Sequence, residues 1–114
     1  MIAPDLLRGS LKTIILKLLD EHGPMYGYQI NHKVKELTTG KIILTYGALY
    51  PVLHKLENEK ILVTASELKN NRMRVYYALT PKGHSLVKEK IEELNEFINT
   101  LQMIIQSKSG LNYA

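Results

Sequence analysis

The sequence contains no cysteine, and this absence excludes several kinds of chemistry at once. Disulfide bonds, zinc sites built from thiolates and cysteine nucleophiles all require that side chain. The four histidines, His22, His32, His54 and His84, do not follow the spacing of a metal-binding motif. We therefore expect neither a metal nor another cofactor.

Long apolar segments and catalytic motifs are lacking as well. No apolar stretch approaches the roughly 20 residues of a membrane-spanning helix, so we expect no membrane contact. The segment Met1–Asp5 has an acid and a proline where a signal peptide needs positive charge and an apolar run, which favours the cytoplasm. Gly40-Lys41 lacks the other residues of a phosphate-binding loop. The serine, histidine and aspartate residues do not lie within a recognisable catalytic motif. Nothing in the sequence indicates an enzyme.

The net charge is +4, and the excess of positive charge is confined to the first 80 residues. These hold 11 Lys and Arg against 7 Asp and Glu, whereas residues 81–114 hold 4 of each kind. A basic compact part joined to a neutral part is typical of a polyanion-binding unit with a separate packing element. A charge of this size also fits an ordinary protein surface, so charge alone leaves both interpretations open.

Apolar residues at helical spacing predict two helices before residue 40. The first runs from Leu7 to Gly23-Pro24, because glycine followed by proline ends a helix. The second has its first core position at Ile30 and ends where Thr38-Thr39-Gly40 breaks the pattern. The run Ile42–Leu44 that follows is rich in β-branched residues and is predicted to be a short strand.

A third helix is expected to begin after Thr45, which stands where an N-cap would lie. Its buried stripe consists of Leu49, Val52, Leu53 and Leu56. That stripe leaves an aromatic and basic outer face, made of Tyr46, Gly47, Tyr50, His54, Lys55 and Asn58. Pro51 removes one backbone hydrogen bond, so we expect a bend there, eased by Gly47.

Two strands follow and are predicted to form a hairpin. They cover residues 61–68 and 73–80, and Lys69-Asn70-Asn71 is the turn, because asparagine tolerates the left-handed conformation. Tyr76 and Tyr77 face opposite sides of the second strand. Tyr77 shares a face with Val75 and Leu79, so we expect it in the core.

The last predicted element is a helix that opens at Thr80-Pro81 and runs to about Ser107. Its apolar stripe has heptad spacing at Val87, Ile91, Leu94, Ile98, Leu101 and Ile105, and Phe97 and Ile104 widen it. A helix of this length spans about 39 Å, whereas an 80-residue globule has a radius of gyration of about 12 Å. Packing between two copies, with the partner's first helix as a further contact, is therefore favoured over burial within one chain.

The predicted fold class is mainly α with a small β-hairpin, that is, a winged helix-turn-helix plus a long C-terminal helix. The chain resembles the PadR family of bacterial transcriptional regulators, in particular its short members with one C-terminal helix. Three segments, in the order and spacing of the family, carry the resemblance: Gly23–Ile30, Tyr46–Glu57, and Arg72–Thr80 with Gly83. The likeness extends from about Leu6 to Leu101.

The resemblance implies that the third helix enters the major groove and that the hairpin contacts the adjacent backbone or minor groove. It also implies dimerisation through the C-terminal helix and repression relieved by a small molecule. The predicted DNA contacts on the helix are Thr45, Tyr46, Gly47, Tyr50, His54 and Lys55. Those on the hairpin are Lys69, Arg72 and Arg74, three cations that can converge on phosphates or a narrow minor groove.

Two other interpretations of these residues stay open. Tyr50 could pack in the core while His54 and Lys55 form a solvated face. The hairpin cations could serve only to discourage aggregation of an edge strand.

We expect a DNA-binding domain at residues 1–80, a dimerisation helix at 81–108 and a flexible tail at 109–114. The expected partners are double-stranded DNA with a two-fold symmetric operator and a second copy of the chain. The predicted function is a sequence-specific repressor, released by a small apolar or aromatic effector that Tyr26, Leu94, Phe97 and Ile98 would line. The alternative is a winged-helix module that mediates protein association and binds DNA only through nonspecific charge.

Overall fold

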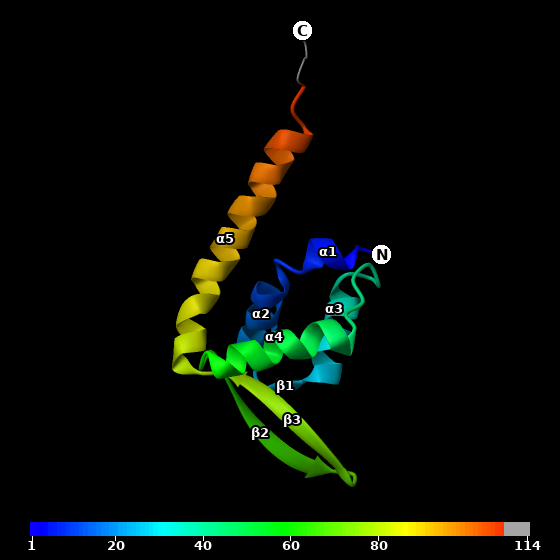
Figure 1. Cartoon of the computed structure of the whole chain (residues 1–114), viewed down its shortest axis with the longest axis vertical. Coiled ribbons are helices and arrows are strands. Elements are labelled where there is room, and N and C mark those ends of the chain that lie inside the picture. The colour runs from blue at the N-terminus through cyan, green and yellow to red at the C-terminus, as the bar shows by residue number, and fades with distance from the viewer. Residues whose placement is uncertain (109–114) are drawn as a thin grey trace.

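The computed structural model describes residues 1–108 and contains, in that range, five helices and a three-stranded antiparallel sheet (Figure 1). The elements are α1 (Pro4–Leu7), α2 (Leu11–His22), β1 (Met25–Tyr26), α3 (Gly27–Leu37), α4 (Tyr46–Asn58), β2 (Leu62–Lys69), β3 (Arg72–Leu79) and α5 (Pro81–Ile105). This is the predicted winged helix-turn-helix with a long C-terminal helix. The tail predicted at residues 109–114 lies outside the described residues.

Helices α2, α3 and α4 pack around one apolar core. Each presents leucine, isoleucine or valine at spacings of three and four residues, which places those side chains on one face. The largest fully buried side chains are Ile15, Leu16, Leu19, Ile30, Leu49, Leu53, Leu56 and Leu62. Among residues 1–108 no polar or charged residue is fully buried, so the core is held by apolar contact.

The predicted N-caps of α4 and α5 are confirmed. The Thr45 hydroxyl accepts a hydrogen bond from the backbone N–H of Ala48 at 3.1 Å. The Thr80 hydroxyl accepts one from the backbone N–H of Gly83, also at 3.1 Å. Such caps satisfy N–H groups that have no partner within the helix.

Strands β2 and β3 form a hairpin, the wing, which projects from the helices (Figure 1). Its two turn residues, Asn70 and Asn71, both have left-handed φ angles, of 51° and 61°. A two-residue turn of this kind matches the twist of the paired strands. β1 pairs with the other edge of β3, where Met25 lies opposite Tyr77. Tyr77 is buried, which confirms its predicted place in the core.

The prediction of a strand at Ile42–Leu44 is wrong. The backbone N–H of Ile42 donates to the Thr38 hydroxyl at 3.0 Å, and the segment is irregular. Of its three side chains only Leu44 is buried, so this segment anchors a loop to the core. The short strand is β1 instead, because β3 offers it a free edge.

The first predicted helix begins at Leu11, four residues later than expected, and Leu7 belongs to a separate short helix. α1 ends at Leu7 and α2 begins at Leu11, with a turn between them. Leu7 and Leu11 are both buried, so the apolar pattern continues across the turn although the helix does not.

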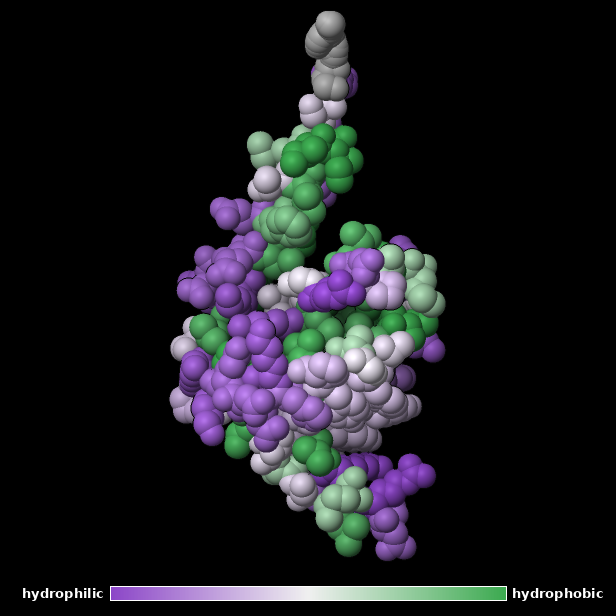
Figure 2. Space-filling view, viewed as in Figure 1, coloured by the Kyte–Doolittle hydropathy of each residue, from purple (hydrophilic) through white to green (hydrophobic). Residues whose placement is uncertain are grey.

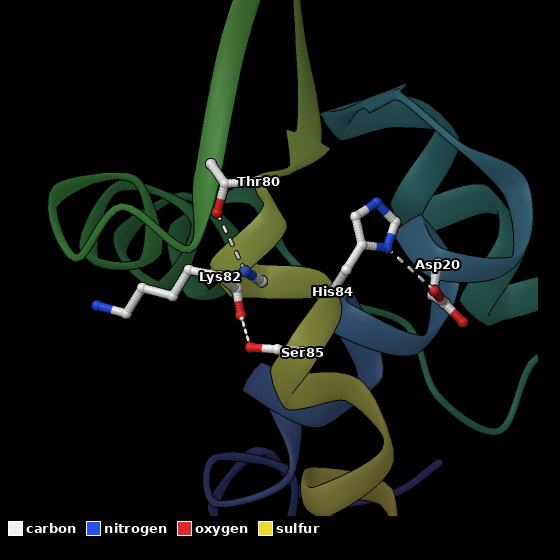
Figure 3. Close-up of polar contacts among 6 residues, drawn as sticks. Asp20, Thr80, Lys82, His84 and Ser85 are labelled. Atoms are coloured by element: carbon white, nitrogen blue, oxygen red, sulfur yellow. Dashed lines mark hydrogen bonds and ion pairs between the residues drawn. The ribbon is translucent and has the colours of Figure 1, made fainter.

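The start of α5 is attached to the residues that follow α4. The Thr80 hydroxyl donates to the carbonyl of Lys60 at 2.6 Å, and the Lys82 ammonium donates to the carbonyl of Glu59 at 2.9 Å. On the other side, His84 Nδ1 of α5 lies 3.4 Å from Asp20 Oδ1 of α2 (Figure 3). These contacts fix the direction in which α5 leaves the domain.

Only the first half of α5 packs on its own chain. Val87 is buried, and Leu86 and Ile91 pack partly buried against the core. The second half stands clear of the other helices (Figure 1), and hydrophobic atoms gather along it (Figure 2). Its exposed apolar residues are Phe97, Ile98, Leu101, Met103, Ile104 and Ile105. We call residues 97–105 the distal α5.

Candidate nucleic-acid interface

The outer face of α4 carries the first group of predicted contacts. Thr45, Tyr46, Gly47, His54 and Lys55 are all exposed there. The leucines at positions 49, 53 and 56 hold the opposite face of the helix in the core. α4 continues through Pro51 without a break in the helix, so these exposed residues belong to one element.

The outward position predicted for Tyr50 holds only in part. Its ring is half-buried against the core and covers Gly27, the first residue of α3. A Cβ atom at Gly27 would overlap the Tyr50 hydroxyl and would lie 2.9 Å from Cζ. Tyr50 therefore fixes α4 against α3. The rings of Tyr46 and His54 lie on either side of Tyr50, with centroids 5.7 Å and 5.9 Å from its own, and remain exposed. We call these three rings the aromatic row.

The cations of the wing share one face of the hairpin, as predicted. Lys69 pairs directly with Arg72, and Glu67 pairs with Arg74; residues directly opposite each other point to the same side. Lys69 and Arg72 are exposed near the turn. Two like charges in this position repel each other, and a polyanion that neutralises both would relieve the repulsion.

Arg74 is half-buried and has a partner within the chain. Its guanidinium carbon lies 4.8 Å from the ring centroid of Tyr26, which is a cation–π contact. Tyr76 meets the same ring edge-on at 5.3 Å. Arg74 thus joins the wing to β1 in addition to carrying charge.

Tyr26 does not lie where a ligand-lining residue was predicted. It stands at the base of the wing, against Arg74 and Tyr76. Leu94 borders a different region, an apolar groove of about 310 Å³ between α2, α3 and α5. The predicted lining set is therefore wrong in its inclusion of Tyr26, because β1 pairs with the wing and carries this ring there.

Tyr28 and His32 extend the aromatic row along α3, and the sequence interpretation missed them. The Tyr26 and Tyr28 rings stack at 6.3 Å, and the Tyr28 and His32 rings at 5.9 Å. Both Tyr28 and His32 are exposed. The sequence held a signal for this, because the spacing of four between Tyr28 and His32 repeats that of Tyr50 and His54.

These contacts connect α4 to the wing without a gap. Tyr46 packs beside Tyr50, Tyr50 covers Gly27, and the preceding residue, Tyr26, lies beneath Arg74. We call the surface formed by these rings and the exposed residues beside them the aromatic–cationic surface; it comprises Tyr26, Tyr28, His32, Thr45, Tyr46, Gly47, Tyr50, His54, Lys55, Lys69, Arg72 and Arg74. Its hydroxyl, imidazole, ammonium and guanidinium groups can all donate hydrogen bonds to phosphate oxygens.

The residues predicted for a dimer seam fall into two groups. Val87 is buried in its own chain, so its assignment to the seam is wrong, and Ile91 and Leu94 are half-buried beside the groove. The other five members of the predicted seam are exposed on the distal α5: Phe97, Ile98, Leu101, Ile104 and Ile105.

The described part of the chain contains no group of three or more His, Asp or Glu side chains that could hold a metal ion. None of the helices between residues 1 and 108 combines the length and the apolar character needed to cross a membrane.

Comparison with known proteins identifies relatives over most of the chain. The profile of the transcriptional regulator PadR-like family matches residues 15–89. A transcriptional regulator from Clostridium thermocellum is 30% identical, with 90% of this chain and 96% of that chain covered and a TM-score of 0.78. A PadR-like transcription factor from Bacteroides fragilis is 34% identical, with 85% and 94% covered and a TM-score of 0.68. A transcriptional regulator of Mycobacterium tuberculosis is 34% identical over 62 residues, 54% of this chain and 58% of that protein.

Proposed function

Because the chain belongs to the PadR-like family of transcriptional regulators, which confirms the resemblance seen in its sequence, we propose that it binds one specific, two-fold symmetric DNA sequence as a homodimer. Members of this family are DNA-binding regulators and not enzymes.

The contacts are assigned from the aromatic–cationic surface, which is the observation that carries the proposal. α4 enters the major groove and presents Thr45, Tyr46, Gly47, His54 and Lys55 to base edges and phosphates. The wing presents Lys69 and Arg72 to phosphates beside the minor groove. Tyr50 and Arg74 contribute mainly by holding α4 and the wing in place, since each is half-buried against another element.

Dimerisation is assigned to the distal α5. An apolar stripe of this length exposed to water favours association, and most of the predicted heptad seam is available there. When two such helices pack about a two-fold axis, each recognition helix faces one half of the operator. Half-sites about one helical turn apart, 10–10.5 base pairs, are expected.

Repression with release by a small molecule is the regulatory part of the proposal. Phe97 and Ile98 lie where the two α5 helices would meet, and Leu94 lies one turn earlier on the same helix. An apolar or aromatic molecule held beside these residues would alter the angle between the two helices. α5 is hydrogen-bonded to the residues after α4 through Thr80 and Lys82. A change in that angle would therefore alter the distance between the two α4 helices, and with it the affinity for DNA.

Selection of bound duplexes from a random pool tests the proposal. We expect one two-fold symmetric sequence that binds at least about a thousandfold more tightly than random duplex. With Lys69→Ala/Arg72→Ala, the slope of log K against log salt should fall by about 0.9 for each phosphate that the variant no longer neutralises. The charge-matched control is Lys88→Ala/Lys108→Ala on α5 and just beyond it, which should keep the wild-type slope. If no sequence is enriched, the protein-association alternative replaces this proposal.

A further inference from the structure

The tip of the wing has two chemically different faces. Leu68 and Met73 lie directly opposite each other in the hairpin. Each is adjacent in sequence to a cation, Lys69 or Arg72, and successive residues of a strand point to opposite faces. The tip is therefore cationic on one face and apolar on the other. Figure 2 shows hydrophobic and hydrophilic atoms side by side at this projecting end.

The apolar face of the tip is not required by the core. On β3, Tyr77 and Leu79 pack on the core, and the same face continues outward through Val75 and Met73. Leu68 is 66% exposed and Met73 is 65% exposed. The strand thus keeps its apolar alternation beyond the end of the core, where contact with water is unfavourable.

We propose that Leu68 and Met73 pack against the sugars that wall the DNA minor groove, and that this contact makes the wing select A·T pairs. The inference rests on the proposed function. The neighbouring charges favour DNA over a protein partner. Lys69 and Arg72 are exposed and lack an acidic partner in the pairing at the tip. Their attraction to phosphates brings the adjacent Leu68 and Met73 close to the DNA backbone. Deoxyribose then offers apolar C–H surface within one residue of those phosphates.

The preference for A·T pairs follows from the chemistry of the groove. A G·C pair presents the guanine N2 amino group there, whereas an A·T pair presents only acceptors. Leucine and methionine offer no good acceptor, so covering that amino group would leave a donor without a hydrogen bond. A·T-rich segments also have a narrow minor groove with a stronger negative potential, which attracts Lys69 and Arg72. The wing would thus discriminate sequence without a hydrogen bond to a base.

The test combines a protein variant with a modified duplex. Replacing adenine with 2,6-diaminopurine outside the sequences read by α4 adds the minor-groove amino group and leaves the major-groove pattern unchanged. Wild-type protein should lose about tenfold in affinity for this duplex. Leu68→Ser/Met73→Ser should bind the unmodified operator about tenfold more weakly, show little response to diaminopurine, and keep the wild-type salt slope. Val63→Ser, at an exposed apolar position near the base of the hairpin, is the control and should bind like wild type.

Two results would overturn the inference while leaving the proposed function intact. One is specific operator binding by the serine variant at wild-type affinity, which would assign the apolar face to a protein partner. The other is an equal effect of diaminopurine on wild type and variant. If the variant fails to fold, the wild-type protein alone tests the inference, because unchanged affinity for the diaminopurine duplex would overturn it. Absence of any specific operator for wild type would overturn the proposed function itself.

Discussion

Gly83, in the first turn of α5, lies so close to the backbone carbonyl of Ile61 that a Cβ atom there would overlap its oxygen. The same Cβ would stand 3.1 Å from Leu79 Cδ2. Thr80 adds a hydrogen bond from its backbone N–H to the Ile61 carbonyl at 3.1 Å. α5, which is assigned to dimerisation, is thus fixed to the residues that follow α4, so α4 and α5 cannot reorient independently.

Gly83→Ala is expected to lower the free energy of unfolding by about 1–3 kcal/mol, because the overlapping atom belongs to backbone and cannot move aside. Urea denaturation measures this effect. The control is Ser85→Ala, an exposed position in the same turn of the helix, which should change stability little. Wild-type stability of Gly83→Ala would show that α5 is not held against Ile61.

Gly47→Ala is expected to separate stability from DNA binding. A Cβ there would meet only the Thr45 hydroxyl, at 3.9 Å, and alanine favours a helix by about 1 kcal/mol relative to glycine. Unfolding should therefore require more urea. Operator affinity should fall, since the added methyl group lies on the face of α4 assigned to the major groove. A variant that is more stable and binds at wild-type affinity would remove Gly47 from the interface.

Tyr77 is expected to make the protein less stable at alkaline pH. Burial raises the pKa of its hydroxyl above the ordinary 10.0, and Tyr50 and Glu57 nearby add to the effect. The folded state therefore holds this proton more tightly than the unfolded state. The contribution is fully present below pH 10 and is lost as the pH rises through the folded pKa.

Tyr77→Phe should unfold much like wild type at pH 7 and lose less stability above about pH 10. Urea denaturation at both pH values measures the difference. Tyr46→Phe, at an exposed position, is the control and should keep the wild-type alkaline loss. Equal alkaline losses in Tyr77→Phe and wild type would contradict the assignment.

Leu101→Lys is expected to weaken dimerisation by at least about a hundredfold, because it places an unpaired charge in the proposed apolar seam. Sedimentation at a series of concentrations gives the dissociation constant. Asn99→Lys adds the same charge at an exposed polar position of the distal α5 and should leave the dimer intact. Equal dissociation constants for the two variants would exclude this stripe as the interface.

The sequence predicts most helices correctly because their apolar spacing and caps are local properties. Thr45 and Thr80, for example, cap α4 and α5 through backbone groups only three residues away. The same local logic failed at Ile42–Leu44, where β-branched residues had no strand to pair with. β1 was missed because Met25 pairs with Tyr77, about fifty residues away.

Burial on α4 and α5 could be predicted only in part, because periodicity shows which face is apolar but not what covers it. Tyr50 has the spacing of an outer residue, yet Gly27 on another helix leaves room for its ring. Val87 and Leu101 both fit the heptad spacing, but only Val87 meets the core of its own chain, before α5 leaves the domain. Such partners become visible only once the elements are arranged in space.

In the proposed complex, one dimer contacts two half-sites on the same side of the DNA. Fluorescence anisotropy should compare the selected operator with the same duplex carrying about five extra base pairs, half a helical turn, at its centre. The insertion turns the half-sites to opposite sides, so we expect affinity to fall almost to that for random duplex, while an insertion of about ten base pairs should cost less. Wild-type affinity for the duplex with the half-turn insertion would contradict the claim, because each half-site would then be bound without regard to the other.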